Sequence, residues 1–201
     1  MTSSQQSGSN YPNWFNIYAK DYFIRHLQEF KGKENLAFLQ IGVFTGDASV
    51  WLLENILTGE GSVLVDVDTW QGSDEKVHHE MDFSDVERTY DNKLEGYDNV
   101  AKCKMNSIEF LATTDDKDYY DFIYIDGDHT AEAVFRDASL AWRALKPGGI
   151  MAFDDYLWEL QLPINLRPQA AIDLFLTLMK DHITLLGSGS QVWIRKEYEI
   201  S

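Results

Sequence analysis

Short apolar segments alternate with helical patterns along most of this chain, from about residue 36 onward. The apolar segments predict strands at 36–41, 63–67, 100–105, 121–125 and 150–153. Between them, apolar residues at helical spacing predict a helix at 47–57, a more polar segment predicts one at 84–94, and a later stripe predicts one at 172–179. Strands that alternate with helices are typical of βαβ units on a parallel sheet.

The clearest helical stripe precedes the strand at 150–153. Apolar residues fall there at i, i+4, i+7, i+8 and i+11, and they are Val134, Ala138, Ala141, Trp142 and Leu145. The sequence Lys-Pro-Gly-Gly at 146–149 is expected to end this helix and to turn the chain into the strand.

The last two apolar segments indicate how the sheet ends. Residues 183–186 and 191–195 flank Gly-Ser-Gly-Ser at 187–190, which is typical of a hairpin. We therefore predict an α/β fold: a Rossmann-like sheet of seven strands, mostly parallel with an antiparallel last strand, and helices on both faces. A dinucleotide-binding Rossmann fold has six parallel strands and a Gly-x-Gly-x-x-Gly turn, so a nicotinamide-dependent oxidoreductase is the less favoured alternative.

The N-terminal part of the chain precedes this alternation. Residues 1–10 are polar and are predicted to form a disordered tail, without the basic and apolar parts of a signal peptide. Residues 11–35 predict a helical segment that is rich in aromatic side chains, followed by one domain at 36–201. Whether the aromatic segment packs on its own sheet or on a partner stays open, and with it a homo-oligomer.

Composition excludes several classes of partner. The formal net charge is −16, with no cluster of Lys and Arg, so we expect the chain not to bind nucleic acid. No segment approaches the roughly 20 apolar residues that a membrane span needs. Cys103 is the only cysteine and cannot form an internal disulfide, which favours a cytoplasmic location.

The turn after the first predicted strand is the first candidate for ligand binding. Gly42 lets the backbone turn and approach a ligand closely, and Gly46 stands where the next helix begins. The free N–H groups at the start of that helix favour a carboxylate on the ligand. Two glycines at this spacing are a weak signal alone, and their place in the first turn of an alternating chain strengthens it.

Acidic residues end the second predicted strand, about 20 residues further on. Asp66 and Asp68 are both placed to accept hydrogen bonds from ribose hydroxyls, and we favour Asp68 because it is nearer the carboxyl end of the strand. Trp70 follows, and either covers the ligand or packs on the loop.

Three more carboxylates follow the strands at 121–125 and 150–153. Asp126, Asp154 and Asp155 are expected to converge, because neighbouring parallel strands end side by side. Uncompensated carboxylates repel one another, and either protonation or a hard divalent cation with oxygen ligands would relieve this repulsion; of such cations we favour Mg²⁺. The alternative is that some of them cap helices or turns, as Asp128 is placed to do.

A histidine stands at the rim of the same expected cleft. His129 follows Asp126 by three residues, and a neutral imidazole there could take the proton of a hydroxyl group. The alternative is a structural loop histidine.

These motifs together resemble a known family. They are Phe-Leu-Gln-Ile-Gly-Val-Phe-Thr-Gly at 38–46, Asp-Thr-Trp-Gln-Gly at 68–72, Tyr-Ile-Asp-Gly-Asp-His at 124–129, Leu-Lys-Pro-Gly-Gly at 145–149 and Phe-Asp-Asp-Tyr at 153–156. The chain is similar to class I S-adenosylmethionine-dependent methyltransferases, and resembles the small metal-dependent O-methyltransferases of the macrocin/mycinamicin and cephalosporin hydroxylase-like group.

The resemblance implies the roles of the site residues. The cofactor would lie at the first turn, with its ribose on Asp68 and its adenine near Asn106 and Ser107. The implied cofactor contacts are Gln40, Gly42, Phe44, Gly46, Ser49, Asp68, Trp70, Asn106, Ser107 and Asp126. Asp126, Asp154 and Asp155 would hold Mg²⁺, with Asp126 and His129 as the catalytic residues.

One residue departs from the pattern of the family. Gln40 stands where these enzymes usually carry an acid, which removes a negative charge near the ammonium group of the cofactor. The resemblance implies Mg²⁺-assisted O-methylation of a small molecule, a sugar or another polyhydroxylated acceptor. Gln40 motivates the alternative of a cofactor-binding regulatory module without catalysis.

Overall fold

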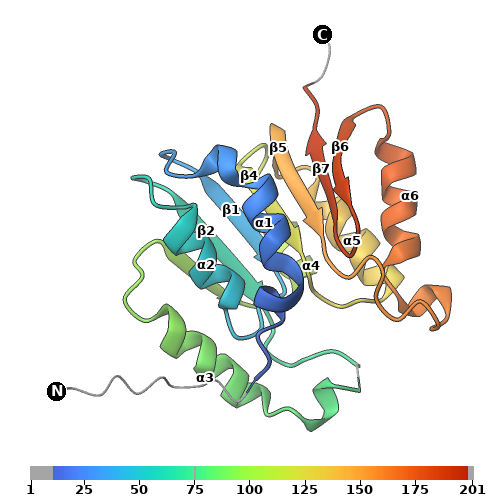
Figure 1. Ribbon diagram of the computed structural model, residues 1–201, viewed down its shortest axis with the longest axis horizontal. Helices are drawn as coiled ribbons and strands as arrows, with labels where there is room; N and C mark the ends of the chain where they lie inside the picture. The colour runs from blue at the N-terminus through green and yellow to red at the C-terminus, as the bar shows by residue number, and fades with distance from the viewer. Residues whose placement is uncertain (1–10, 75, 199–201) are drawn as a thin grey trace.

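The computed structural model describes residues 11–74 and 76–198, and it contains one seven-stranded sheet with helices on both faces (Figure 1). The predicted tail at 1–10 lies outside the described residues. The strand order is β3-β2-β1-β4-β5-β7-β6. The strands are β1 (Ala37–Ile41), β2 (Val63–Asp68), β3 (Val100–Lys104), β4 (Tyr120–Ile125), β5 (Leu145–Phe153), β6 (Ile183–Ser188) and β7 (Val192–Lys196).

The pairing confirms the predicted fold class. Strands β3, β2, β1, β4 and β5 pair in parallel, whereas β7 is antiparallel to both β5 and β6. Because β1 lies between β2 and β4, the direction in which strands are added reverses there. Open α/β sheets bind ligands outside the carboxyl ends of the strands at such a switch point.

The helices form two layers that cover opposite faces of the sheet. They are α1 (Lys20–His26), α2 (Asp47–Asn55), α3 (Phe83–Leu94), α4 (Ser107–Thr113), α5 (Ala131–Ala141) and α6 (Gln169–Met179), with short turns η1 (Phe15–Ala19), η2 (Gln28–Phe30), η3 (His78–Glu80) and η4 (Ile164–Leu166). Side chains of α1, α2 and α3 pack on one face, and those of α4, α5 and α6 pack on the other. No helix among the described residues is long and apolar enough to span a bilayer.

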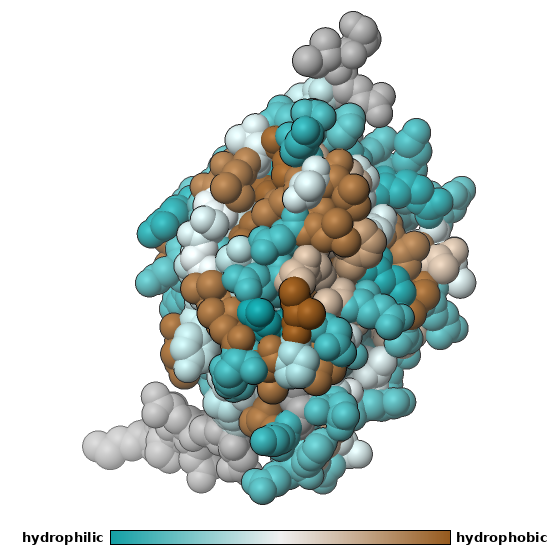
Figure 2. Space-filling view, turned by 90° about the vertical axis from the view of Figure 1, so that its right-hand side faces the viewer, coloured by the Kyte–Doolittle hydropathy of each residue, from teal (hydrophilic) through white to brown (hydrophobic). Residues whose placement is uncertain are grey.

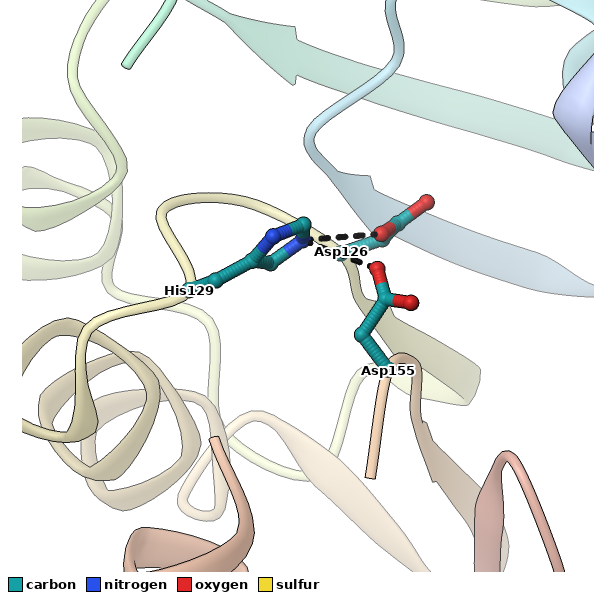
Figure 3. Close-up of side chains that lie close together, drawn as sticks. All are labelled: Asp126, His129 and Asp155. Atoms are coloured by element: carbon teal, nitrogen blue, oxygen red, sulfur yellow. Dashed lines mark ion pairs between the residues drawn. The ribbon is translucent and has the colours of Figure 1, made fainter. Parts of the chain in front are cut away.

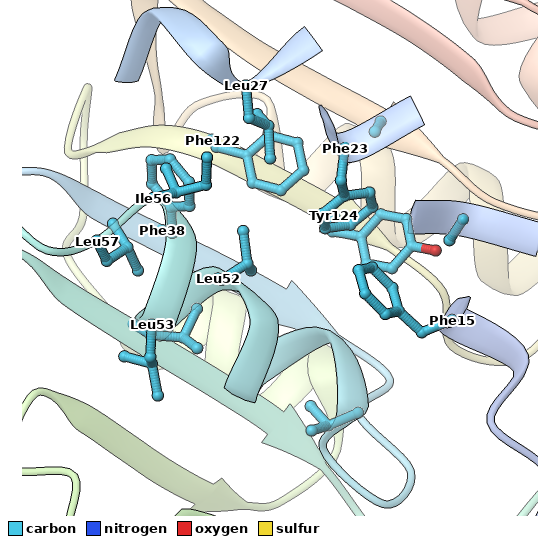
Figure 4. Close-up of a cluster of buried hydrophobic side chains, with 14 of the residues drawn as sticks. Phe15, Phe23, Leu27, Phe38, Leu52, Leu53, Ile56, Leu57, Phe122 and Tyr124 are labelled. Atoms are coloured by element: carbon cyan, nitrogen blue, oxygen red, sulfur yellow. The ribbon is translucent and has the colours of Figure 1, made fainter. Parts of the chain in front are cut away.

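The aromatic N-terminal segment packs on its own sheet. Phe23 is fully buried and contacts Phe122 and Tyr124 of β4 edge-to-face, and Trp193 of β7 in the same way. Figure 4 shows Phe23 with Phe122 and Tyr124 in this cluster, which continues through Leu52 of α2. Burying each such side chain contributes about 1.5–3 kcal/mol, so the segment is an integral part of this core.

The boundary between α5 and β5 differs from the prediction. The helix ends at Ala141, and Leu145 already belongs to β5, where it pairs with Tyr120. A register shift follows between Tyr120 and Phe122, so the Pro-Gly-Gly sequence forms an irregular first half of the strand. Only residues from Ile150 onward pair with β7, which leaves Pro147 beside one neighbouring strand and explains why it is tolerated. The short helix α4 was also missed.

Candidate active site

A cavity of about 690 Å³ opens at the carboxyl ends of β1, β2, β4 and β5. This volume lies in the range of about 300–1,000 Å³ that is usual for small-molecule sites. Ten of the predicted residues line it: Gly42, Phe44, Asp68, Trp70, Asn106, Ser107, Asp126, His129, Asp154 and Asp155. Four of the five sequence motifs therefore meet in one place, and the Leu-Lys-Pro-Gly-Gly motif at 145–149 lies outside it.

The first turn contains two glycines that are required for different reasons. Gly42 has φ +82°, and a Cβ atom there would lie 1.8 Å from the backbone oxygen of Asp126. Gly46 has φ +78°, and a Cβ atom there would lie 2.8 Å from the side chains of Tyr90 and Leu94 on α3. Gly42 thus lets β1 and β4 approach beneath the cavity, whereas Gly46 lets α3 pack on the start of α2.

The carboxylate of Asp68 organises this turn. Its Oδ2 accepts hydrogen bonds from the backbone N–H groups of Val43 at 2.7 Å and Phe44 at 3.0 Å, and its Oδ1 accepts one from Trp70 N–H at 2.7 Å. A carboxylate has about four acceptor sites, so capacity remains for a ligand hydroxyl. Of the two acids that end β2, Asp68 lines the cavity and Asp66 is fully buried.

Trp70 and Asn106 both have structural contacts as well. The Trp70 indole is 4% exposed, donates from Nε1 to the Phe44 carbonyl at 2.9 Å and packs on Tyr90. Asn106 caps α4 by accepting the N–H of Ile108 at 2.8 Å. Both remain at the cavity wall, so their polar or aromatic surfaces can also meet a ligand.

Gln40 and Ser49 lie beneath the cavity and do not line it. Gln40 Nε2 donates to Ser49 Oγ at 2.9 Å and to Asp66 Oδ1 at 2.8 Å, and Tyr90 donates to Asp66 Oδ2 at 3.0 Å. Gln40 and Asp66 are directly opposite on paired strands. Gln40 stands where the family usually carries an acid, and the neighbouring strand β2 places an acid, Asp66, directly beside it. Burial raises the pKa of the Asp66 carboxyl to about 6, and its hydrogen bonds with Gln40, Ser49 and Tyr90 offset this in part.

This buried acid predicts a pH dependence of stability. A carboxyl with pKa about 6 when folded and about 3.9 when unfolded binds more protons in the folded state between these values. Stability therefore falls as pH rises from 4 to 7, and Asp66 contributes roughly 2 kcal/mol of the change. Urea unfolding at pH 4 and pH 7 measures this change, and it should be smaller in Asp66→Asn by the contribution of Asp66. An identical pH dependence of stability in the variant and the wild-type protein would contradict the prediction.

Two carboxylates and an imidazole meet on the β4–β5 side of the cavity (Figure 3). His129 Nε2 lies 3.0 Å from Asp155 Oδ2 and 3.7 Å from Asp126 Oδ1, and one ligand atom of each residue lies within 4.8 Å of the others. Asp126 follows directly on β4, and Asp155 is the second residue after β5, so the ends of these neighbouring strands bring the two carboxylates together. The ring of Trp158 lies 5.0 Å from that of His129 and forms the adjoining wall.

Asp154 belongs to a different set of contacts from the one predicted. Its Oδ2 accepts a hydrogen bond from the Tyr124 hydroxyl, and its Oδ1 accepts one from Asp155 N–H at 2.8 Å. Gln191 of the β6–β7 hairpin donates to Tyr124 at 3.1 Å. Asp154 is thus held beside the group of Asp126, His129 and Asp155 without contributing a ligand atom to it.

The electrostatics of this region favour a cation. Within the described part of the chain, no Lys or Arg side chain pairs with Asp126, Asp154 or Asp155. Desolvation, followed by repulsion from Asp154, raises the pKa of Asp126 well above its usual value. Desolvation and repulsion from Asp155 raise the pKa of Asp154 to about 6. Oxygen donors with unbalanced negative charge fit a hard divalent cation such as Mg²⁺.

The N-terminal segment supplies a wall that the motifs did not reveal. Trp14 stacks on Phe44 with ring centroids 4.7 Å apart, and Asn13 donates to Asp47 at 3.0 Å. Both contacts hold the segment against the first turn. Tyr124 and Asp137 were also missed. An acid among the apolar positions of the α5 stripe was the available signal for Asp137.

Comparisons with known proteins agree with this geometry. A family model described as a methyltransferase domain matches residues 39–156, which is more than half of the chain. The chain belongs to the S-adenosylmethionine-dependent methyltransferases. A comparison of the sequence of this methyltransferase with curated proteins finds no match.

Solved structures show the same fold at low sequence identity. A Clostridium thermocellum protein provisionally named an rRNA methylase has a TM-score of 0.62 and 14% identity, covering 95% of this chain and 99% of its own. The O-methyltransferase TomG from Streptomyces achromogenes, solved with S-adenosylmethionine, has a TM-score of 0.57 and 14% identity over 81% and 73% of the two chains. MycE of the mycinamycin pathway, solved with Mg and S-adenosylhomocysteine, has a TM-score of 0.57 and 14% identity over 90% and 50%. A likeness at 14% identity shows the fold alone, so it leaves the acceptor of this methyltransferase undecided.

Proposed function

We propose that this methyltransferase transfers a methyl group to a hydroxyl of a small molecule, a sugar or another polyhydroxylated acceptor, with the help of Mg²⁺. The observation that carries the proposal is the group of Asp126, His129 and Asp155, which lines the same cavity as the turn at Gly42 and the carboxylate of Asp68. One cavity of this size can hold a cofactor and an acceptor next to each other.

The proposed roles follow from these positions. S-adenosylmethionine would supply a methyl group on a positively charged sulfur. The acceptor oxygen would bond to the methyl carbon in line with the carbon–sulfur bond, which breaks to release S-adenosylhomocysteine. Asp68 would bind the ribose hydroxyls, and the turn at 42–46 would lie along the methionine part. Asp126 and Asp155 would hold Mg²⁺, which positions vicinal hydroxyls and lowers the pKa of the reacting one. His129 would take its proton, and Trp158 would limit the access of water.

A small-molecule acceptor is preferred to nucleic acid because of charge. The chain carries −16, and the described basic side chains of β3 are paired with acids of α3, as Lys102 is with Glu87 and Asp91. A strongly negative surface without a basic groove repels phosphate backbones. We also place the protein in the cytoplasm, in keeping with its single cysteine.

Thermal unfolding with ligands tests the cofactor assignment. At 100 times its dissociation constant, S-adenosylhomocysteine should add about 2.7 kcal/mol of stability, which raises Tm by roughly 5–10 °C. NAD at the same concentration serves as the matched control and should leave Tm unchanged. A shift with NAD and none with S-adenosylhomocysteine would sink the proposal. Labelled methyl transfer to polyhydroxylated acceptors then separates an enzyme from the regulatory module that Gln40 suggests, in which the cofactor binds and no methyl group moves.

A further inference from the structure

Asp155 reaches His129 from an unusual backbone conformation. Its φ of +56° lies in the left-handed region, which is unfavourable for residues other than glycine. Such conformations persist only where the surrounding contacts hold them, and they gather at functional sites. From this conformation the carboxylate of Asp155 points toward His129, with Oδ2 3.0 Å from Nε2 (Figure 3). The orientation of this carboxylate therefore depends on whatever holds the backbone of Asp155 in place.

The side chain of Asp154 makes the contact that bears most directly on this conformation. Its Oδ1 accepts the N–H of Asp155 at 2.8 Å. Because this N–H belongs to the peptide unit between the two residues, the bond limits rotation about φ of Asp155. The backbone N–H of Asp154 itself donates to the Ile125 carbonyl at 3.0 Å. Tyr156 N–H donates to the Ser190 carbonyl at 2.8 Å. The backbone at 154–156 is thus held between the end of β4 and the β6–β7 hairpin.

A series of buried hydrogen bonds holds Asp154 in turn. The Tyr124 hydroxyl donates to its Oδ2, and Gln191 Nε2 donates to the Tyr124 hydroxyl at 3.1 Å. Trp193 Nε1 then donates to Gln191 Oε1 at 2.9 Å. The side chains of Tyr124, Gln191 and Trp193 are fully buried, so leaving any of these polar groups without a partner would be costly. Both carboxylate oxygens of Asp154 accept hydrogen bonds here, and neither belongs to the ligand atoms that lie within 4.8 Å of one another.

We infer that Asp154 is a positioning residue, which Tyr124 and Gln191 hold so that it fixes the backbone of Asp155 and turns that carboxylate toward the proposed cation site. This inference rests on the proposed function, because it presupposes that a divalent cation binds at Asp126 and Asp155. The alternative is that Asp154 binds the cation itself. In that case the Tyr124 hydroxyl competes with the cation for Oδ2 of Asp154, whereas for a positioning residue the hydroxyl supports cation binding.

Removal of the Tyr124 hydroxyl has opposite effects under the two alternatives. Mn²⁺ affinity, followed by electron paramagnetic resonance, should fall about 10-fold in Tyr124→Phe, because loss of a hydrogen bond that orients a ligand costs about 10- to 100-fold in metal affinity. If Asp154 is instead a ligand, the affinity should stay the same or rise, since its Oδ2 becomes available to the cation. Tyr90→Phe is the matched control. It removes another buried hydroxyl that donates to a carboxylate, that of Asp66, and should leave Mn²⁺ affinity unchanged.

The outcomes separate this inference from the proposed function. Unchanged or higher Mn²⁺ affinity in Tyr124→Phe, or an equal fall in Tyr90→Phe, would overturn the role of Asp154 while the cation site stands. No binding of Mn²⁺ by the wild-type protein would overturn both. If Tyr124→Phe does not fold, Gln191→Met decides. It removes the donor to Tyr124 from a residue that does not line the cavity, so Mn²⁺ affinity should fall by at least about threefold, and an unchanged affinity would contradict the inference.

Discussion

Gly42→Ala is expected to destabilise the protein by more than about 3 kcal/mol and to abolish binding of S-adenosylhomocysteine. The new Cβ atom would lie 1.8 Å from the backbone oxygen of Asp126, closer than any real contact, so the backbone of β1 or β4 must move. A left-handed conformation adds roughly 1–2 kcal/mol for alanine. Losses above about 4 kcal/mol are exceptional for one substitution and mark a backbone conflict of this kind. Urea unfolding and calorimetry measure the two effects.

Gly96→Ala provides a matched control for this prediction. Gly96 has φ +93°, but no atom lies within 4 Å of the point that a Cβ atom there would occupy. The variant should therefore show the conformational cost alone, about 1–2 kcal/mol, with unchanged binding. If both variants lose the same stability, the overlap with Asp126 is not the cause.

Asp155→Asn is expected to lower affinity for a divalent cation by at least about 100-fold and to reduce methyl transfer by a similar or larger factor. The substitution removes one of the two carboxylates that face His129 and leaves the rest of the cavity in place. Mn²⁺ binding, followed by electron paramagnetic resonance, measures the first effect without knowledge of the acceptor. Affinity for S-adenosylhomocysteine should change little.

Two further variants make this prediction sharper. Asp98→Asn removes an exposed acid beside the start of β3, at the opposite edge of the sheet, and should bind Mn²⁺ as the wild-type protein does. His129→Ala distinguishes the two roles that the geometry allows. Retained Mn²⁺ binding with lost transfer assigns the histidine as a base, and lost Mn²⁺ binding assigns it as a ligand. Wild-type Mn²⁺ affinity in Asp155→Asn would refute the proposed cation site.

The sequence predicted the sheet because its strands are strongly apolar and regularly spaced. It missed the start of β5 because Leu145 continues the helical stripe of α5, whereas pairing with Tyr120 decides its place. It missed α4 because seven residues carry little periodicity. Such outcomes depend on tertiary contacts that local patterns do not contain.

The candidate site was predictable as far as strand ends determine it. Asp68, Asp126 and Asp155 line one cavity because parallel strands end at the same edge. The orientation of Asp154 was not predictable, since it depends on Tyr124, which is 30 residues away in the chain. The contact of Gln40 with Asp66 was not predictable either, because it depends on the register of β1 and β2. The requirement for glycine at position 46 depends on the packing of α3 against the start of α2.

Several large apolar side chains away from the candidate site are exposed at the surface. Figure 2 shows hydrophobic residues gathered on the face that bears α6. Leu174 and Leu178 of this helix are 49% and 60% exposed. This surface bears on the oligomeric state, which the sequence left open.

The place of β7 in the sheet has a consequence for synthesis on the ribosome. β7 is the seventh strand along the chain, and it is not an edge strand, because it lies between β5 and β6. Until residue 196 has left the ribosome, β5 keeps one side unpaired, and Phe23 lacks its contact with Trp193. The two ends of the chain must then meet across most of its length, which slows folding because distant segments have to find each other. A nascent chain of this protein therefore exposes an open side of β5 from the time this strand is made until β7 joins it, and in that interval it is most prone to aggregate.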